Sequence, residues 1–197
     1  MKFLVDEMLG DVCRWLRMLG YDSKFAKDYE LKYDKESPDE SVKDSDLINE
    51  CYDEKRILIT RDIEMSRIME DKFTRLLKKN PKEALEFGID SKDGEIITPC
   101  ILLKERNNSD RLSKIHKKFN LSLKYVPRTA RCPKCNSRLS IIEDITIYKD
   151  KIPEKVYEFH KEFWKCQNED CANIYWKGTH MEEILKKLKK IKKESVN

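Results

Sequence analysis

Two short cysteine pairs near the C-terminus constrain this chain more than any other feature of its sequence. Cys132 and Cys135 have two residues between them, whereas Cys166 and Cys171 have four. Zn²⁺ takes four thiolates in a tetrahedron, and short pairs present two each from tight turns. The thirty residues between the pairs leave room for a β-hairpin. We therefore expect a structural zinc site, with no open position for catalysis.

The alternatives to a zinc site are a redox pair and a coincidental grouping of cysteines. One pair alone would leave both alternatives open, but two compact pairs argue against them. The remaining cysteines, Cys13, Cys51 and Cys100, stand singly among apolar residues, as is typical of small buried hydrophobes. An odd total of seven also argues against a secreted disulfide framework. Metal binding should supply much of the folding energy of the segment around the pairs.

The first two thirds of the chain alternate between strand and helix patterns. Residues 2–5 read as a strand and 8–19 as an amphipathic helix. The continuous apolar run at 56–60 predicts a strand covered on both faces, as in a parallel sheet. Further elements are expected as a short strand near 25–26, helices over 44–54, 63–80 and 110–119, and a strand over 96–103. This order predicts an α/β domain with a mainly parallel sheet.

The character of the sequence changes after residue 126, where short strands, paired cysteines and aromatic residues begin. We divide the chain into an α/β domain (1–126), a zinc-binding segment (127–181) and a basic amphipathic helix or tail (182–197). The tail has apolar residues at helical spacing and many lysines. It could dock on a protein partner or on its own domain. Its lysines could attract a polyanion or could simply be solvated.

Composition adds an expectation about location. No stretch approaches the roughly 20 consecutive apolar residues of a membrane span, and the first residues do not resemble a signal peptide. We therefore expect a soluble, cytoplasmic protein. The net charge of +4, from 41 basic and 37 acidic residues, decides little because opposite charges on different surfaces cancel in it.

Acidic residues stand where an α/β sheet places functional groups. Asp6 follows the first strand, Asp62 follows the strand at 56–60, and Asp44 opens the preceding helix, with Asp46 beside it. Ligands of open parallel sheets bind beyond the carboxyl ends of the strands, so Asp6 and Asp62 should share a crevice. Converging carboxylates repel each other unless a cation joins them. Mg²⁺ or Mn²⁺ is the expected catalytic ion, because it binds carboxylates and phosphates and can activate water.

Each acid also has a simpler interpretation. Asp44 and Asp62 could serve as N-caps of the helices that they open. Glu64 is a reserve ligand with weaker placement. Phospho-aspartate or acyl chemistry at Asp6 would require a second aspartate two residues later, where Met8 stands.

A series of short motifs runs through most of the chain: Phe3-Leu4-Val5-Asp6, Arg14-Trp15-Leu16-Arg17, Asp44-Ser45-Asp46, Leu58-Ile59-Thr60-Arg61-Asp62, Arg131-Cys132-Pro133-Lys134-Cys135 and Tyr175-Trp176-Lys177-Gly178-Thr179-His180. In this order they resemble the mutator-seven C-terminal RNase-domain family, PIN-like nucleases fused to a zinc ribbon. The resemblance implies a PIN-like three-layer fold and hydrolysis of RNA to a 5′-phosphate and a 3′-hydroxyl. It places Asp6, Asp44 and Asp62 on the family's acidic positions.

The chain departs from the family pattern in three places. The second cysteine pair has four intervening residues where the family commonly has two. The segments 27–43 and 71–108 are longer than usual. The first of these could alter access to the acids.

Candidate RNA contacts fall into two groups. Arg14, Arg17 and Arg61 should lie near the acids, where arginine can bind phosphate oxygens in a bidentate manner. Trp176 and His180 could stack on the bases of single-stranded RNA. The alternative for the aromatic residues is packing around a small core, which suits Trp164 best.

We predict a Mg²⁺- or Mn²⁺-dependent ribonuclease whose zinc ribbon aids RNA binding or fold stability. The alternative is a non-catalytic RNA- or ribosome-binding zinc-ribbon protein. The two differ at the acids, because catalysis requires Asp6 and Asp62 and binding does not.

Overall fold

The first part of the chain folds around a parallel β-sheet. The computed structural model describes residues 1–29, 43–87 and 96–194. The sheet has the order β2–β1–β3–β4, formed by β1 (Lys2–Val5), β2 (Asp22–Phe25), β3 (Ile57–Thr60) and β4 (Cys100–Leu102). Its three strand pairs are all parallel. The expected α/β fold with a mainly parallel sheet is therefore confirmed.

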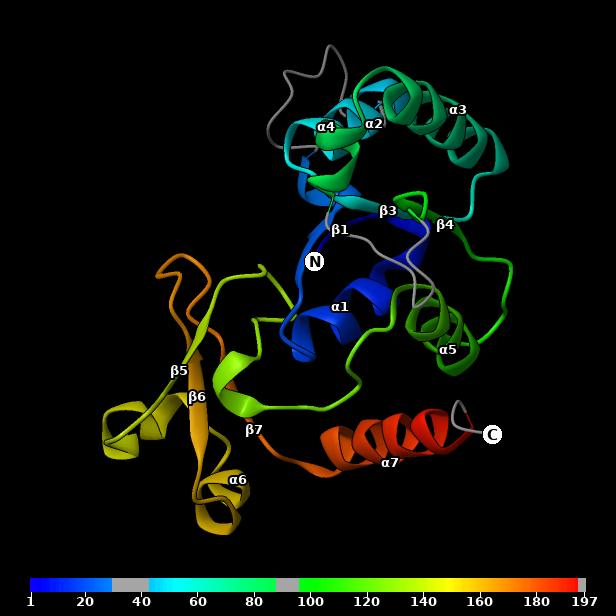
Figure 1. Ribbon diagram of the computed structural model, residues 1–197. Helices are drawn as coiled ribbons and strands as arrows, with labels where there is room; N and C mark the ends of the chain where they lie inside the picture. Colours follow the sequence, from blue (N-terminus) through cyan, green and yellow to red (C-terminus); the bar gives the residue numbers. More distant parts are fainter. Residues whose placement is uncertain (30–42, 88–95, 195–197) are drawn as a thin grey trace.

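Helices cover both faces of this sheet (Figure 1). Helices α2 (Asp44–Asp53), α3 (Ile63–Lys79) and α4 (Pro81–Leu85) lie on one face, and α1 (Gly10–Met18) and α5 (Asn108–Phe119) lie on the other. Every residue of β3 is buried as a result. This double covering is the physical reason that β3 is continuously apolar and not alternating.

Two local features mark helix boundaries in the sheet region. A 3-10 turn, η1 (Glu7–Leu9), precedes α1. Pro81 ends the long helical pattern as expected, but it also begins α4, a short helix that the sequence pattern did not predict.

Within the described ranges, no helix combines the length and the apolar composition that crossing a bilayer requires. The predicted loop 27–43 lies mostly outside the described residues, as does part of 71–108.

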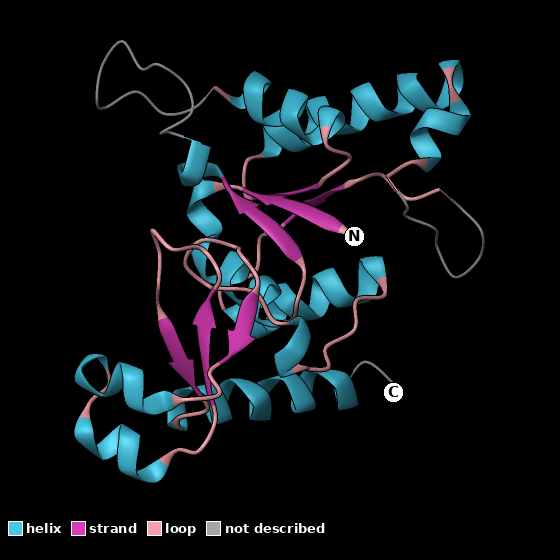
Figure 2. Ribbon diagram, turned by 90° about the vertical axis from the view of Figure 1, so that its left-hand side faces the viewer, coloured by secondary structure: helices cyan, strands magenta, loops and turns pink. Residues whose placement is uncertain are grey.

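A second, antiparallel sheet follows (Figure 2). Its strands are β5 (Leu139–Ile141), β6 (Phe163–Cys166) and β7 (Ile174–Trp176), in that order. The turn η3 (Pro127–Thr129) leads into it, and η4 (Ile145–Lys151) and α6 (Glu154–Phe159) lie between β5 and β6. The cysteine pairs are thus separated by an antiparallel strand pair with a helical insertion.

The Lys-rich end of the chain forms helix α7 (Thr179–Glu194), which packs on α5. Its apolar residues Ile184, Leu188 and Ile191 are buried in the same hydrophobic core as the parallel sheet. Among the options left open by the sequence, the structure shows docking on the chain's own fold. The lysines of the helix remain exposed.

Candidate functional site

The carboxyl ends of β1 and β3 bring Asp6 and Asp62 to a common hydrogen-bond partner, the Thr60 hydroxyl. Asp6 is only 6% exposed, and its Oδ2 accepts a hydrogen bond from Thr60 Oγ1 at 2.8 Å. The same hydroxyl accepts a hydrogen bond from the backbone N–H of Asp62 at 2.9 Å. The two acids therefore lie at one edge of the sheet, held in place by a single shared side chain.

Asp62 is the N-cap of α3. Its Oδ1 accepts a hydrogen bond from the backbone N–H of Met65 at 2.7 Å. A cap of this kind occupies one carboxylate oxygen, and Oδ2 forms no hydrogen bond with another described residue. The capping interpretation of Asp62 therefore holds, but it leaves one oxygen available to a ligand.

The charges of the neighbouring acids act on the Asp44 carboxyl. It is the first residue of α2, after the N-cap Lys43, so it is not itself the cap. Partial burial raises the pKa of the Asp44 carboxyl, and the negative charges of Asp62, Asp6 and Glu7 raise it further. Three elements thus direct carboxylates toward the same region. A cation placed among them would relieve this repulsion.

The acids form an open arrangement. Among residues 1–29, 43–87 and 96–194, only the four cysteines have ligand atoms close enough together for a group of three or more metal ligands. Asp46 lies half-buried in the first turn of α2. The reserve acid Glu64 is paired with Arg67 at 2.6 Å. An open set of carboxylates suits an ion such as Mg²⁺, which keeps several waters and shares its ligands with substrate phosphates.

The surroundings of the acids are cationic and apolar. Arg61, between Thr60 and Asp62, has an exposed side chain. Met8 lies in the 3-10 turn that follows Asp6, and Ile63 begins the helix that follows Asp62. Their side chains are 62% and 65% exposed. Exposed apolar side chains beside a polar site can contact bases or riboses.

The four cysteines form a compact cluster. All four sulfur atoms lie within 4.8 Å of one another. The sulfurs of Cys132 and Cys171 are 3.7 Å apart, and those of Cys135 and Cys166 are 3.3 Å apart. Every cysteine of the chain is a free thiol. The cluster could therefore bind a metal ion.

Side chains around the cluster fix the sulfur positions. The Tyr175 hydroxyl lies 3.0 Å from Cys132 Sγ, and Asn173 Nδ2 donates to Cys171 Sγ at 3.3 Å. Asn136 closes the first turn in the left-handed conformation, with φ of 66°, and its N–H donates to the Cys132 carbonyl at 2.9 Å. Asparagine tolerates this conformation better than most residues do.

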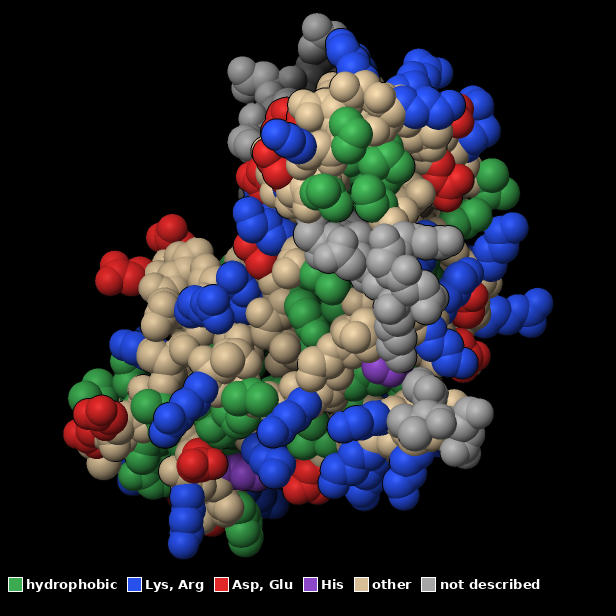
Figure 3. Space-filling model, in the orientation of Figure 1, with side chains coloured by type: hydrophobic (Ala, Val, Ile, Leu, Met, Phe, Trp, Pro, Cys, Tyr) green, Lys and Arg blue, Asp and Glu red, His purple; other side chains and the backbone are tan. Residues whose placement is uncertain are grey.

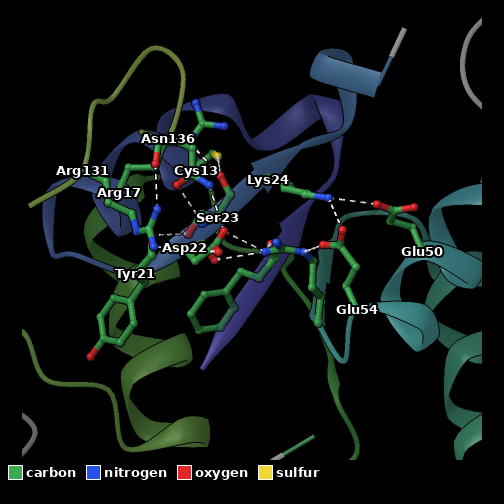
Figure 4. Close-up of polar contacts among 12 residues, drawn as sticks. Cys13, Arg17, Tyr21, Asp22, Ser23, Lys24, Glu50, Glu54, Arg131 and Asn136 are labelled. Atoms are coloured by element: carbon green, nitrogen blue, oxygen red, sulfur yellow. Dashed lines mark hydrogen bonds and ion pairs between the residues drawn. The ribbon is translucent and has the colours of Figure 1, made fainter. Parts of the chain in front are cut away.

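A group of polar contacts, the polar seam, joins the first cysteine turn to the parallel sheet (Figure 4). Asn136 Oδ1 accepts from the Ser23 N–H at 3.1 Å, and its Nδ2 donates to Asp22 Oδ1 at 2.8 Å. The backbone N–H of Arg131 donates to the Arg17 carbonyl at 2.8 Å. Because Ser23 belongs to the edge strand β2, the turn covers that edge.

Arg17 is part of the polar seam, which corrects its predicted role in RNA binding. It is 2% exposed. Its Nε donates to the Ser23 carbonyl at 2.7 Å, and Nη1 donates to the carbonyls of Pro133 and Lys134 at 3.0 and 2.9 Å. Its Nη2 pairs with Asp28 at 2.7 Å. The amphipathic pattern of α1 placed Arg17 on the solvent side, but the cysteine region covers that side.

Three of the predicted RNA contacts, Arg14, Trp176 and His180, line a common groove of about 650 Å³, here called the aromatic groove. It lies between α1, β7 and α7, and Trp15 and Tyr175 also line it. Arg14 is exposed and pairs with Asp11 at 3.2 Å. Trp164 does not line this groove and is buried, as its packing interpretation predicted.

Sequence reasoning missed several residues of these sites. Glu7 acts on Asp44 electrostatically, and its adjacency to Asp6 was the available signal. Thr60 was visible only as the end of a strand, because a shared hydroxyl cannot be read from a linear pattern. Trp15 lies on α1, far in sequence from Trp176, and no local spacing connects them.

Comparison with known proteins gives one family. The model of the Mut7-C RNAse domain matches residues 1–188. No curated protein and no solved structure matches the chain.

Proposed function

Because the chain belongs to the Mut7-C RNAse domain family, a family of nucleases, we propose that it is a ribonuclease dependent on Mg²⁺ or Mn²⁺. The observation that carries the proposal is that Asp6 and Asp62 share the Thr60 hydroxyl at the carboxyl edge of the parallel sheet, near enough to Asp44 for their charges to raise its pKa. This edge is where open α/β sheets bind their ligands.

The acids fit a divalent ion by their chemistry and their electrostatics. Asp6, Asp62 and Asp44 would hold it, with Asp46 as a further ligand. Partial burial is the largest cause of the raised pKa of Asp44, and the charges of Asp62, Asp6 and Glu7 add to it. A cation would remove this added repulsion. When bound, such an ion supplies an activated water and stabilises charge at phosphorus.

The residues of the chain would perform the remaining tasks. Thr60 fixes the Asp6 carboxylate through its hydroxyl, and the α3 N-terminus fixes Asp62. Arg61 would hold a phosphate of the substrate. Met8 and Ile63 would contact the bases or riboses on either side of the cleaved bond.

We also propose that the cysteine cluster is a structural zinc site. A tetrahedron with Zn–S bonds of about 2.3 Å separates its sulfurs by about 3.8 Å. The observed separations of 3.3 and 3.7 Å are close to this value. Four thiolates would leave no position for substrate, so the ion would stabilise the fold and take no part in hydrolysis.

The substrate is proposed to be single-stranded RNA. Helix α1 begins four residues after Asp6 and carries Asp11, Arg14, Trp15 and Met18 along one wall of the aromatic groove. Unpaired bases could stack there on Trp176, Trp15 or His180. A strand lying along α1 would connect this groove with the acids.

The architecture is proposed to be PIN-like over 1–126, with a zinc ribbon over 127–181 and the basic helix over 182–197 returning to the first domain. A cytoplasmic location remains a prediction.

Cleavage of a labelled generic RNA with Mn²⁺ tests the enzyme. We expect Asp6→Asn and Asp62→Asn to reduce the rate at least about a hundredfold, since each removes a charge from the ion's site. Asp53→Asn is the matched control, because Asp53 ends the helix that Asp44 begins and its side chain is exposed. Equal rates for all variants would mean that a contaminant cleaves the RNA. Binding of RNA without any cleavage would favour the alternative, a non-catalytic RNA- or ribosome-binding protein.

A further inference from the structure

A second groove, distinct from the aromatic groove, lies beside helix α7. It encloses about 410 Å³. We call it the lysine groove because four lysines line it. They come from the 123–127 segment, from the position after β7 and from α7: Lys124, Lys177, Lys189 and Lys192. Residues far apart in sequence therefore direct positive charge into one hollow.

The described residues leave most of the positive charge of this groove without an acidic partner. Within the described part of the chain, none of the four lysines forms an ion pair with an acidic side chain, and Glu162 is the one acidic residue of the lining. Basic side chains gather along the lower edge of the molecule, over α7, in Figure 3. Such a concentration of unpaired ammonium groups attracts polyanions.

The walls of the lysine groove are aromatic and apolar. Trp164 is 7% exposed and Tyr125 is half-buried, and Leu185 and Leu188 complete the α7 side. A lining of this kind holds its shape better than exposed lysines on an isolated helix would. The groove is therefore a formed surface and not only a cluster of flexible charges.

Helix α7 contributes residues to both grooves, and the two grooves differ in charge. The aromatic groove balances Arg14 and Lys187 against Asp11 and Glu183. The lysine groove has four lysines against one glutamate. A balanced aromatic lining suits bases, whereas an excess of lysine suits phosphates.

We propose that the lysine groove binds the phosphodiester backbone of the RNA, away from the point of cleavage. This inference rests on the proposed function for the identity of the polyanion. Lysine provides point charges on flexible stems, which contact phosphates without reading sequence. The groove would therefore increase affinity for RNA of any sequence by stabilising the complex of protein and RNA before cleavage.

The test is the salt dependence of RNA binding. The full-length Asp62→Asn variant is used in buffer without Mg²⁺ or Mn²⁺, so that binding is measured without cleavage and bound zinc is left in place. The probe is a labelled oligouridylate, followed by fluorescence anisotropy. We expect Lys189→Gln with Lys192→Gln to weaken binding about tenfold at low salt and to reduce the slope of log K against log salt by about 1.4.

The matched control is Lys186→Gln with Lys193→Gln. These lysines lie on the same helix, are exposed and line neither groove, so this pair should change the slope much less. Equal effects of both pairs would overturn the proposal in favour of a diffuse charge effect. Competition by a free mononucleotide as strong as that by the oligomer would overturn it in favour of a nucleotide pocket. Selective loss of binding in the groove variant would support it even if no cleavage activity is found, so the two proposals can fail separately.

Discussion

The two regions of this molecule are held together by different forces. The parallel-sheet region has an extensive apolar core with strands β1 and β3 at its centre. The region at 127–178 has six buried residues of its own, and none of them belongs to that core: Ala130, Cys132, Ile152, Phe163, Trp164 and Cys166. Two of the six are cysteines of the cluster. The first region is thus stabilised by burial of apolar surface, whereas the second has little such surface and, under the zinc proposal, depends on its cysteines and on the polar seam.

This difference predicts which substitutions should destabilise each region most. Apolar burial is distributed over many residues, so the sheet region should lose stability gradually as single residues are changed. A metal cluster concentrates stability in four side chains. The following predictions test that contrast.

The largest effect is expected from Cys135→Ser. Loss of one thiolate should abolish zinc binding, and in zinc-finger peptides such binding is worth on the order of 10 kcal/mol. Residues 127–178 should become sensitive to protease while the sheet region stays protected. Metal analysis and limited proteolysis measure both results. Cys51→Ala, in the sheet core, is the control and should keep its zinc. Stoichiometric zinc and native protection in Cys135→Ser would show that the ligand set is wrong.

Arg17→Met should separate the two regions. The change leaves the Pro133 and Lys134 carbonyls without their donor and leaves Asp28 unpaired. Three carbonyls, those of Ser23, Pro133 and Lys134, lose a charged donor, which should cost about 3 to 5 kcal/mol together. Asp28, whose side chain is 48% exposed, stays solvated and adds little. We expect two unfolding transitions in urea instead of one. Arg14→Met, three residues earlier on the exposed face, should cost less than about 1 kcal/mol. A single, unshifted transition in Arg17→Met would mean that the polar seam contributes little.

Leu188→Ala should weaken the sheet region although α7 follows the cysteine region in sequence. Leu188 is buried in the main core, and such a truncation costs about 3 kcal/mol. Urea denaturation and hydrogen exchange in α5 would report it. The half-buried Leu185 provides a milder companion, Leu185→Ala. Loss of exchange protection confined to 127–178 would contradict the assignment of α7 to the sheet core.

The smallest effect is expected from Asp62→Asn. Asparagine also caps helices, so the change removes charge and keeps the cap. The folded-state pKa of Asp44 is raised, so its contribution to stability is present at low pH and is lost as pH rises through that pKa. Without Mg²⁺ or Mn²⁺ at neutral pH, the variant should be more stable than the wild type by less than about 1 kcal/mol. Thermal denaturation with added Mn²⁺ should reverse this order. A variant less stable than the wild type in both conditions would reduce Asp62 to a cap.

The sequence predicted most elements of the sheet region, although not α4, because their signals are local. Continuous apolar runs such as that at 57–60 and the Pro81 interruption need no knowledge of the rest of the fold. Arg17 was misassigned because two of the carbonyls that it binds, those of Pro133 and Lys134, lie more than a hundred positions away. The two grooves were also out of reach, since each is lined by segments that only the folded chain brings together.

The return of helix α7 to α5 has a consequence for synthesis. Each groove is lined in part by α7, and α7 is the last described element of the chain. A chain still being translated can form its acidic edge first, since domains fold from the N-terminus as they emerge. It cannot complete either groove until helix α7 has been made. If the grooves hold RNA as proposed, firm capture of RNA would wait until α7 has emerged and packed on α5.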